Sequence, residues 1–116
     1  MTVYDPDAPT GSGRWHWVVY TIPAGTTQLA EGAGTRDGKA LPVGSTQGPT
    51  DFGAPGFGGA CPPAGDKPHR YIFTVYALKT DNRDIPAEAT AALVGFMITG
   101  NKIGEARLTA MYGRKK

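Results

Sequence analysis

Two aspartates near the start of the chain stand in a stiff turn, where their carboxylates could do chemistry. Asp5 and Asp7 belong to the run DPDAP, residues 5–9, which follows a short apolar stretch. The two prolines fix their own φ angles and bias the preceding residues toward extended backbone. The carboxylates are therefore presented by a rigid turn, ready to accept hydrogen bonds. The alternative is an ordinary turn in which each carboxylate caps its own backbone.

The chain has two histidines, His16 and His69, and each stands at the start of a segment with strand character. If the two strands are neighbours, both imidazole rings lie at one end of the sheet. An aspartate of the 5–9 turn can then accept a hydrogen bond from a ring nitrogen, which fixes the tautomer and raises the imidazole pKa. The alternative is a pair of core histidines that are satisfied within the fold.

A loop rich in glycine and proline leads into the second histidine. It runs from Gly58 through Cys61 to Pro68 and is followed by His69-Arg70. Glycines let the backbone approach a ligand closely, and successive N–H groups in such a turn form an anion-binding concavity. Together with Arg70 and cationic imidazoles, this loop could bind a phosphate or a carboxylate. We expect the affinity for such an anion to fall as the histidines lose their protons. Cys61 adds a thiol, either as a small buried residue or as a redox-sensitive group.

Two other chemistries would use the same residues. Aspartate–histidine pairs are also tools of general acid–base catalysis, and Cys61 could act as a nucleophile, which would make the protein an enzyme for a small substrate. His16, His69 and a carboxylate could instead hold zinc. The sequence shows neither an activated serine nor tight metal-ligand spacing. We therefore expect a binding protein with no catalytic residue, no metal and no cofactor.

Strands must position these groups. Residues 16–22 and 71–78 are β-branched and aromatic, with apolar side chains on both faces, which is typical of central strands. Residues 3–4 form a strand stub, and residues 107–112 alternate as a further strand. Residues 23–70 hold 11 of the 17 glycines and 7 of the 10 prolines, and a connection this long is usually functional or disordered. Its apolar side chains favour an ordered, functional loop.

One helix is predicted after residue 84, and we expect it to cover one side of the sheet. Asp84 can cap it and Pro86 suits its first turn. The helix would end at Gly100-Asn101 or at Gly104. Its expected apolar face consists of Ala89, Leu93, Phe96 and Met97.

Composition limits the class of protein. The chain has 116 residues and a mass of 12.2 kDa, the size of one domain spanning residues 1–116. Residues are 40% hydrophobic and 19% charged, which excludes a disordered chain. The net charge is +2, and residues 114–116 carry three positive charges, so the remaining chain is close to neutral and nucleic-acid binding is not expected. A single cysteine and the absence of a visible signal peptide favour the cytoplasm.

The motifs described above resemble the phosphatidylethanolamine-binding protein family. The first block consists of DPDAP at residues 5–9 and WHWVV at residues 15–19, and the second of GGACPP at residues 58–63 and HRYIFTVYAL at residues 69–78. The resemblance is closest to the bacterial branch, the Raf-kinase-inhibitor-like proteins, and covers essentially the whole chain.

The resemblance implies a mainly β fold, in which a central sheet packs against a smaller sheet with one or two short helices. It also implies a pocket that binds small anionic or phosphorylated ligands, and a regulatory role such as inhibition of a kinase or protease. The Tyr71 phenol would donate to the anion at the pocket wall. The pocket residues at the matching positions are Asp5, Asp7, Pro9, His16, Gly59, Cys61, Pro63, His69 and Tyr71.

One departure concerns the start of the chain. Family members carry several strands before the DPDAP block, which begins here at residue 5. We therefore expect a domain without those N-terminal strands. An unpaired sheet edge next to residues 1–4 would then favour association with a second copy as a homodimer.

Overall fold

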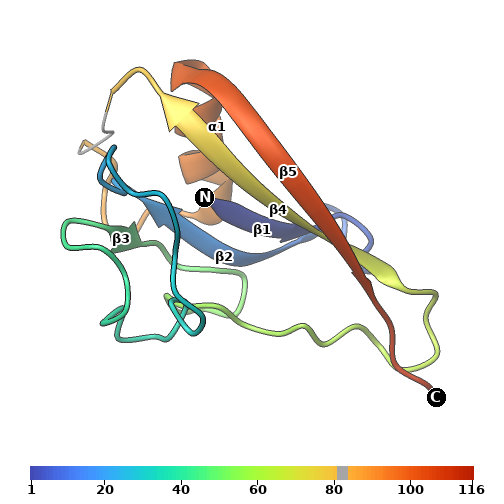
Figure 1. Ribbon diagram of the computed structural model, residues 1–116. Coiled ribbons are helices and arrows are strands. Elements are labelled where there is room, and N and C mark those ends of the chain that lie inside the picture. The colour runs from blue at the N-terminus through green and yellow to red at the C-terminus, as the bar shows by residue number, and fades with distance from the viewer. Residues whose placement is uncertain (81–83) are drawn as a thin grey trace.

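The computed structural model describes residues 1–80 and 84–116, and within them the chain forms a mainly β fold with one short helix (Figure 1). This confirms the expected mainly β fold with a short helix, but the described strands form one sheet and not the expected pair of a central and a smaller sheet. The strands form one five-stranded antiparallel sheet in the order β3-β2-β1-β4-β5. In chain order the elements are β1 (Thr2–Asp5), β2 (Arg14–Tyr20), β3 (Thr46–Gln47), β4 (His69–Leu78), α1 (Ala91–Asn101) and β5 (Lys102–Tyr112).

The short strand β1 lies in the middle of this sheet. It pairs with β2 on one side and with β4 on the other, so the expected unpaired edge beside residues 1–4 is wrong. Thr2 and Val3 point to opposite faces and both are buried, as a central strand requires. The two histidine strands are therefore separated by β1 rather than adjacent. Among the described strands, β5 forms the outer edge next to β4 and is exposed along its whole length.

The two faces of the sheet are covered differently. Helix α1 packs on one face, where its buried side chains join Val18 and Tyr20 of β2 in a hydrophobic cluster. On the other face, Val3 and Val19 pack against apolar side chains of the long connection between β2 and β4. Within the described residues, that face is therefore covered by a loop, and the loop is ordered through its apolar side chains.

Helix α1 begins later than the sequence suggests. Asp84 does not cap it; Thr90 does, because its side-chain oxygen accepts a hydrogen bond from the backbone N–H three residues further on, at 3.1 Å. Pro86 belongs instead to a separate turn, in which its carbonyl accepts from the N–H of Ala89 at 3.0 Å. The helix runs directly into β5, which starts at Lys102 and so precedes the expected strand 107–112 by five residues.

The buried face of α1 agrees only in part with the expected one, because Ala89 and Met97 pack in the cluster under the helix. Ala91, Val94 and Ile98 face the sheet, whereas Leu93 and Phe96 are 42% and 77% exposed. Apolar side chains surround the helix, so their spacing is compatible with either face. Packing against Val18 and Tyr20, rather than the sequence of the helix, selects the face that is buried.

We expect Ile98→Ala to lower the free energy of unfolding by about 2–5 kcal/mol, because it opens a cavity in the cluster under α1. Phe96→Ala is the matched control on the exposed face, and its effect should stay within about 0.5 kcal/mol. Urea denaturation followed by circular dichroism measures both. A larger loss for Phe96→Ala than for Ile98→Ala would mean that the helix presents its other face to the sheet.

Candidate functional site

A β-bulge in β2 determines where His16 points. Val3 of β1 lies opposite Trp17, but the next residue, Tyr4, lies opposite Trp15, so His16 is an extra residue without a counterpart. Bulges of this kind redirect a side chain from the regular alternation. As a result, His16 lies on the same face of the sheet as its neighbour Trp17 and is surrounded by aromatic side chains.

The His16 ring is 2% exposed and is enclosed by three aromatic rings. Its centroid lies 5.2 Å from that of Phe52, 6.4 Å from that of Phe57 and 5.2 Å from that of Tyr71. The first two come from the long connection and Tyr71 comes from β4. The loop and the sheet together therefore hold the imidazole in one orientation.

One nitrogen of the His16 ring has a partner and the other has none. Nδ1 lies 2.5 Å from the carbonyl oxygen of Gly58. A carbonyl oxygen only accepts, so Nδ1 carries a proton and donates. Nε2 is buried and has no hydrogen-bond partner among the described residues. In the neutral ring this atom is an acceptor, and in the cationic ring it is a second donor.

Gly59 supports this arrangement without lining the site. Its φ is +95°, and a Cβ atom at this position would lie 2.6 Å from Nδ1 of His16. No side chain fits in that space, so the glycine allows the loop to approach the imidazole ring closely. Gly59, predicted as a pocket residue, does not line the pocket and instead contacts the His16 ring.

His69 is held between two carboxylates. Its Nδ1 lies 2.7 Å from Oδ2 of Asp5, and its Nε2 lies 3.0 Å from Oδ2 of Asp66. Burial alone lowers the pKa of His69, but the hydrogen bonds to both carboxylates and their negative charges outweigh burial and raise it above 6.5. Both ring nitrogens donate in the imidazolium form, so neither is left free to bind another group.

Asp7 and Arg70 form a pair outside the pocket. The guanidinium of Arg70 donates to both carboxylate oxygens of Asp7, at 2.8 Å and 3.0 Å, and the backbone N–H of Arg70 donates at 2.9 Å. These contacts lower the pKa of Asp7 to about 2. Arg70, which the sequence suggests as a group that holds an anion, instead pairs with Asp7, joins the 5–9 turn to β4 and does not line the pocket.

Most of the predicted residues line one small pocket of about 120 Å³. Of the nine residues predicted, seven line it, and Asp7 and Gly59 do not. Four lining residues were not predicted, among them Arg14, whose charge at the start of an apolar strand was the available signal. The complete lining is Asp5, Ala8, Pro9, Thr10, Arg14, His16, Cys61, Pro62, Pro63, His69 and Tyr71.

Three polar atoms of this lining are buried without a hydrogen-bond partner among the described residues: Nε2 of His16, the hydroxyl of Tyr71 and Nε of Arg14. Burial, and then the charge of Asp5, raise the pKa of Tyr71 to about 12, so its hydroxyl keeps its proton. The guanidinium carbon of Arg14 lies 3.9 Å from the ring centroid of Phe52, which holds the charge at the pocket. Unpaired buried polar groups are rare, and each needs an explanation.

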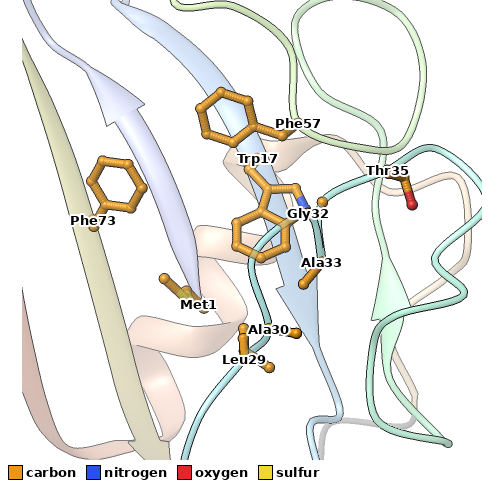
Figure 2. A pocket seen from close by; sticks show the side chains of 10 residues that line it. Met1, Trp17, Leu29, Ala30, Gly32, Ala33, Thr35, Phe57 and Phe73 are labelled. Atoms are coloured by element: carbon orange, nitrogen blue, oxygen red, sulfur yellow. The ribbon is translucent and has the colours of Figure 1, made fainter.

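A second, larger pocket lies on the same face and has a different character (Figure 2). It measures about 530 Å³, and Trp17, Phe57 and Phe73 supply its aromatic lining. The Trp17 indole N–H is already used by Gln47, at 2.7 Å. Phe57 lies next to both pockets, because its centroid is 6.4 Å from His16 and 6.5 Å from Phe73. The lining of this pocket is mainly apolar. The polar and titratable side chains that could bind a charged ligand line the smaller pocket instead.

Residues 1–80 and 84–116 contain neither a candidate metal site nor a candidate membrane span. No three His, Cys, Asp or Glu side chains gather there closely enough to hold a metal ion. No helix in the described residues is both long and apolar enough to cross a bilayer.

Comparison with known proteins gives consistent matches over nearly the whole chain. Residues 1–113 match the family model described as phosphatidylethanolamine-binding protein. Two Escherichia coli proteins, YbcL and YbhB, are 58% and 49% identical over 112 residues, or 97% of this chain. The matched region is 61% of YbcL and 70% of YbhB, so this chain spans about three fifths of the first relative.

Solved structures agree with these matches. The crystal structure of Escherichia coli YbcL, described as a new member of the mammalian PEBP family, superposes with a TM-score of 0.95 and 58% identity. A Chlamydia trachomatis homologue of the same family superposes with a TM-score of 0.76 and 27% identity. Each superposition covers 98% of this chain and 70% of the other.

We expect Gly59→Ala to cost about 1–3 kcal/mol more in unfolding free energy than Gly65→Ala, because only the first places a methyl group against the buried His16 ring. Both glycines have positive φ, so the backbone strain is shared. At Gly65 the added Cβ meets only the flexible side chain of Lys116. Urea denaturation gives the difference, and the ring nitrogen resonances of His16 should shift in Gly59→Ala alone. Equal losses would show that the loop does not press on the ring.

Proposed function

The chain belongs to the phosphatidylethanolamine-binding protein family, and from this premise we propose that its small polar pocket binds an anion, specifically a phosphate group. One observation carries the proposal: three buried polar atoms belong to the lining of one pocket and lack hydrogen-bond partners among residues 1–80 and 84–116. Leaving such a group unpaired costs about 1–3 kcal/mol. A ligand that supplies oxygen atoms would satisfy all three, which explains why the fold tolerates them.

The chemistry of the three atoms favours an oxyanion. The Tyr71 hydroxyl and Nε of Arg14 are donors and suit negatively charged oxygens. Nε2 of the neutral His16 ring accepts, so it pairs with the hydroxyl of a protonated phosphate; in the cationic ring it donates to an ionised oxygen. A monohydrogen or dihydrogen phosphate group offers both kinds of oxygen.

The size of the pocket sets the size of the group that enters it. A volume of about 120 Å³ is enough for a small group and too little for a large ligand. A tetrahedral oxyanion fits in this space, whereas a larger ligand can place only its head group there. The proposed ligand is therefore a phosphate group, either free or as the head group of a larger molecule.

The carboxylate of Asp5 lines the pocket but is already engaged. Its Oδ2 accepts from the His69 ring, and its Oδ1 accepts from the backbone N–H of Asp7 at 2.8 Å. The imidazolium charge of His69 offsets the charge of Asp5, so the carboxylate does not repel an anion while His69 stays protonated. Above the raised pKa of His69 that compensation is lost, and the pocket gains negative charge.

We expect sulfate affinity, measured by calorimetry over a pH series, to fall as the pH rises through the raised pKa of His69, because the imidazolium charge is lost there. Sulfate keeps the same charge over this range, so a change reports on the protein. Asp66→Asn removes one of the carboxylates that raise the pKa of His69, so its affinity should fall at a lower pH than that of the wild type. Affinities that do not change with pH would contradict this role of His69.

We expect Tyr71→Phe to weaken phosphate and phosphorylethanolamine binding about 10- to 100-fold, because a hydrogen bond to a charged group contributes about 1.5–3 kcal/mol. Tyr112→Phe removes an exposed phenol outside the pocket and is the matched control. Calorimetry at pH 6 compares the four combinations. Equal weakening for both ligands indicates that the phosphate group alone is recognised. Unchanged binding in Tyr71→Phe would refute the proposed site.

A further inference from the structure

Cys61 has no part in the hydrogen bonds described above, yet it lines the polar pocket. Its residue is exposed, so a dissolved reagent can reach it, and it forms no disulfide. The next residue, Pro62, is fully buried, and its carbonyl accepts from Nε of Arg114 at 2.7 Å. The backbone beside the thiol is therefore fixed, which holds Cys61 at the mouth of the pocket.

The same pocket contains the polar atoms that would recognise an anionic group. The Tyr71 hydroxyl and Nε2 of His16 belong to side chains that are 3% and 2% exposed, and neither atom has a partner among the described residues. A reagent with a carboxylate could place that group against these atoms while its reactive atom lies near the thiol. Binding would raise the local concentration of the reagent at Cys61.

We propose that Cys61 is a modification site for small thiol-reactive molecules that carry an anionic group, and that its modification closes the pocket to phosphate. The part concerning phosphate rests on the function proposed above. The class of reagent is a low-molecular-weight disulfide bearing carboxylates, of which glutathione disulfide is an example. Because the pocket holds only one small group, the carboxylate of such an adduct and a phosphate group compete for the same atoms.

The reaction is a thiol–disulfide exchange and needs no other oxidant. The Cys61 thiol gives its proton to solvent, and its sulfur attacks one sulfur of the disulfide. A bond forms between these two sulfurs, and the original S–S bond breaks. The second half leaves as a thiolate and takes up a proton. A reducing thiol reverses the sequence and opens the pocket again.

The test compares two alkylating reagents of nearly equal shape, anionic iodoacetate and neutral iodoacetamide. In each, the Cys61 sulfur forms a bond to carbon and iodide leaves. We expect the ratio of the iodoacetate rate to the iodoacetamide rate, followed by intact mass, to be about tenfold higher in the folded protein than in urea, as one charge-assisted hydrogen bond predicts. Tyr71→Phe should bring the ratio close to its value in urea, and Tyr112→Phe should leave it unchanged.

Equal ratios in the folded protein and in urea, or no effect of Tyr71→Phe, would overturn the Cys61 proposal. Protein treated with glutathione disulfide should carry one adduct that a reducing thiol removes, and calorimetry should show that the adduct no longer binds sulfate. An adduct that still binds sulfate would overturn the closing of the pocket. If the unmodified protein binds neither sulfate nor phosphate, the proposed function fails, while the ratio of alkylation rates still decides whether Cys61 lies beside an anion site.

Discussion

The buried hydrogen bond between Asp5 and His69 is the contact on which the rest of the site depends. It joins the end of β1 to the start of β4 at 2.7 Å, with both side chains almost fully buried. Removing one partner of such a pair leaves an uncompensated buried charge, which costs several kcal/mol. Asp66 and the backbone of Asp7 complete the hydrogen bonding, so the turn, the two strands and the loop before β4 are held in one arrangement.

This arrangement separates the residues that build the pocket from those that face a ligand. His69, Asp5 and Gly59 satisfy one another or make space within the protein. His16, Tyr71 and Arg14, in contrast, each keep a buried polar atom without a partner among the described residues. The fold thus carries an energetic cost at three positions and surrounds them with groups whose hydrogen bonds are satisfied. Such a division is typical of a preorganised binding site, because the ligand meets atoms that need little further ordering.

Much of the site could be predicted from the sequence because its residues are rare types in short, stiff segments. The DPDAP turn and the loop before His69 can be recognised from short stretches of sequence. Seven of the nine predicted residues line one pocket. The helix was harder to predict. Its apolar side chains lie on all sides, so neither its first residue nor its buried face follows from spacing. Arg70 illustrates a similar limit, because its charge could serve a ligand or a neighbouring carboxylate.

The kinds of groups available, and the stiffness of the segments that carry them, follow from the amino-acid sequence, since both depend on residue type and on neighbours along the chain. The tertiary structure alone decided which groups meet. The bulge that turns His16 toward the pocket arises from pairing with β1, and the pairing of Asp7 with Arg70 joins residues 63 positions apart. Contacts of this kind depend on strand order and register, which are set by the packing of the whole sheet and leave no local signal in the chain.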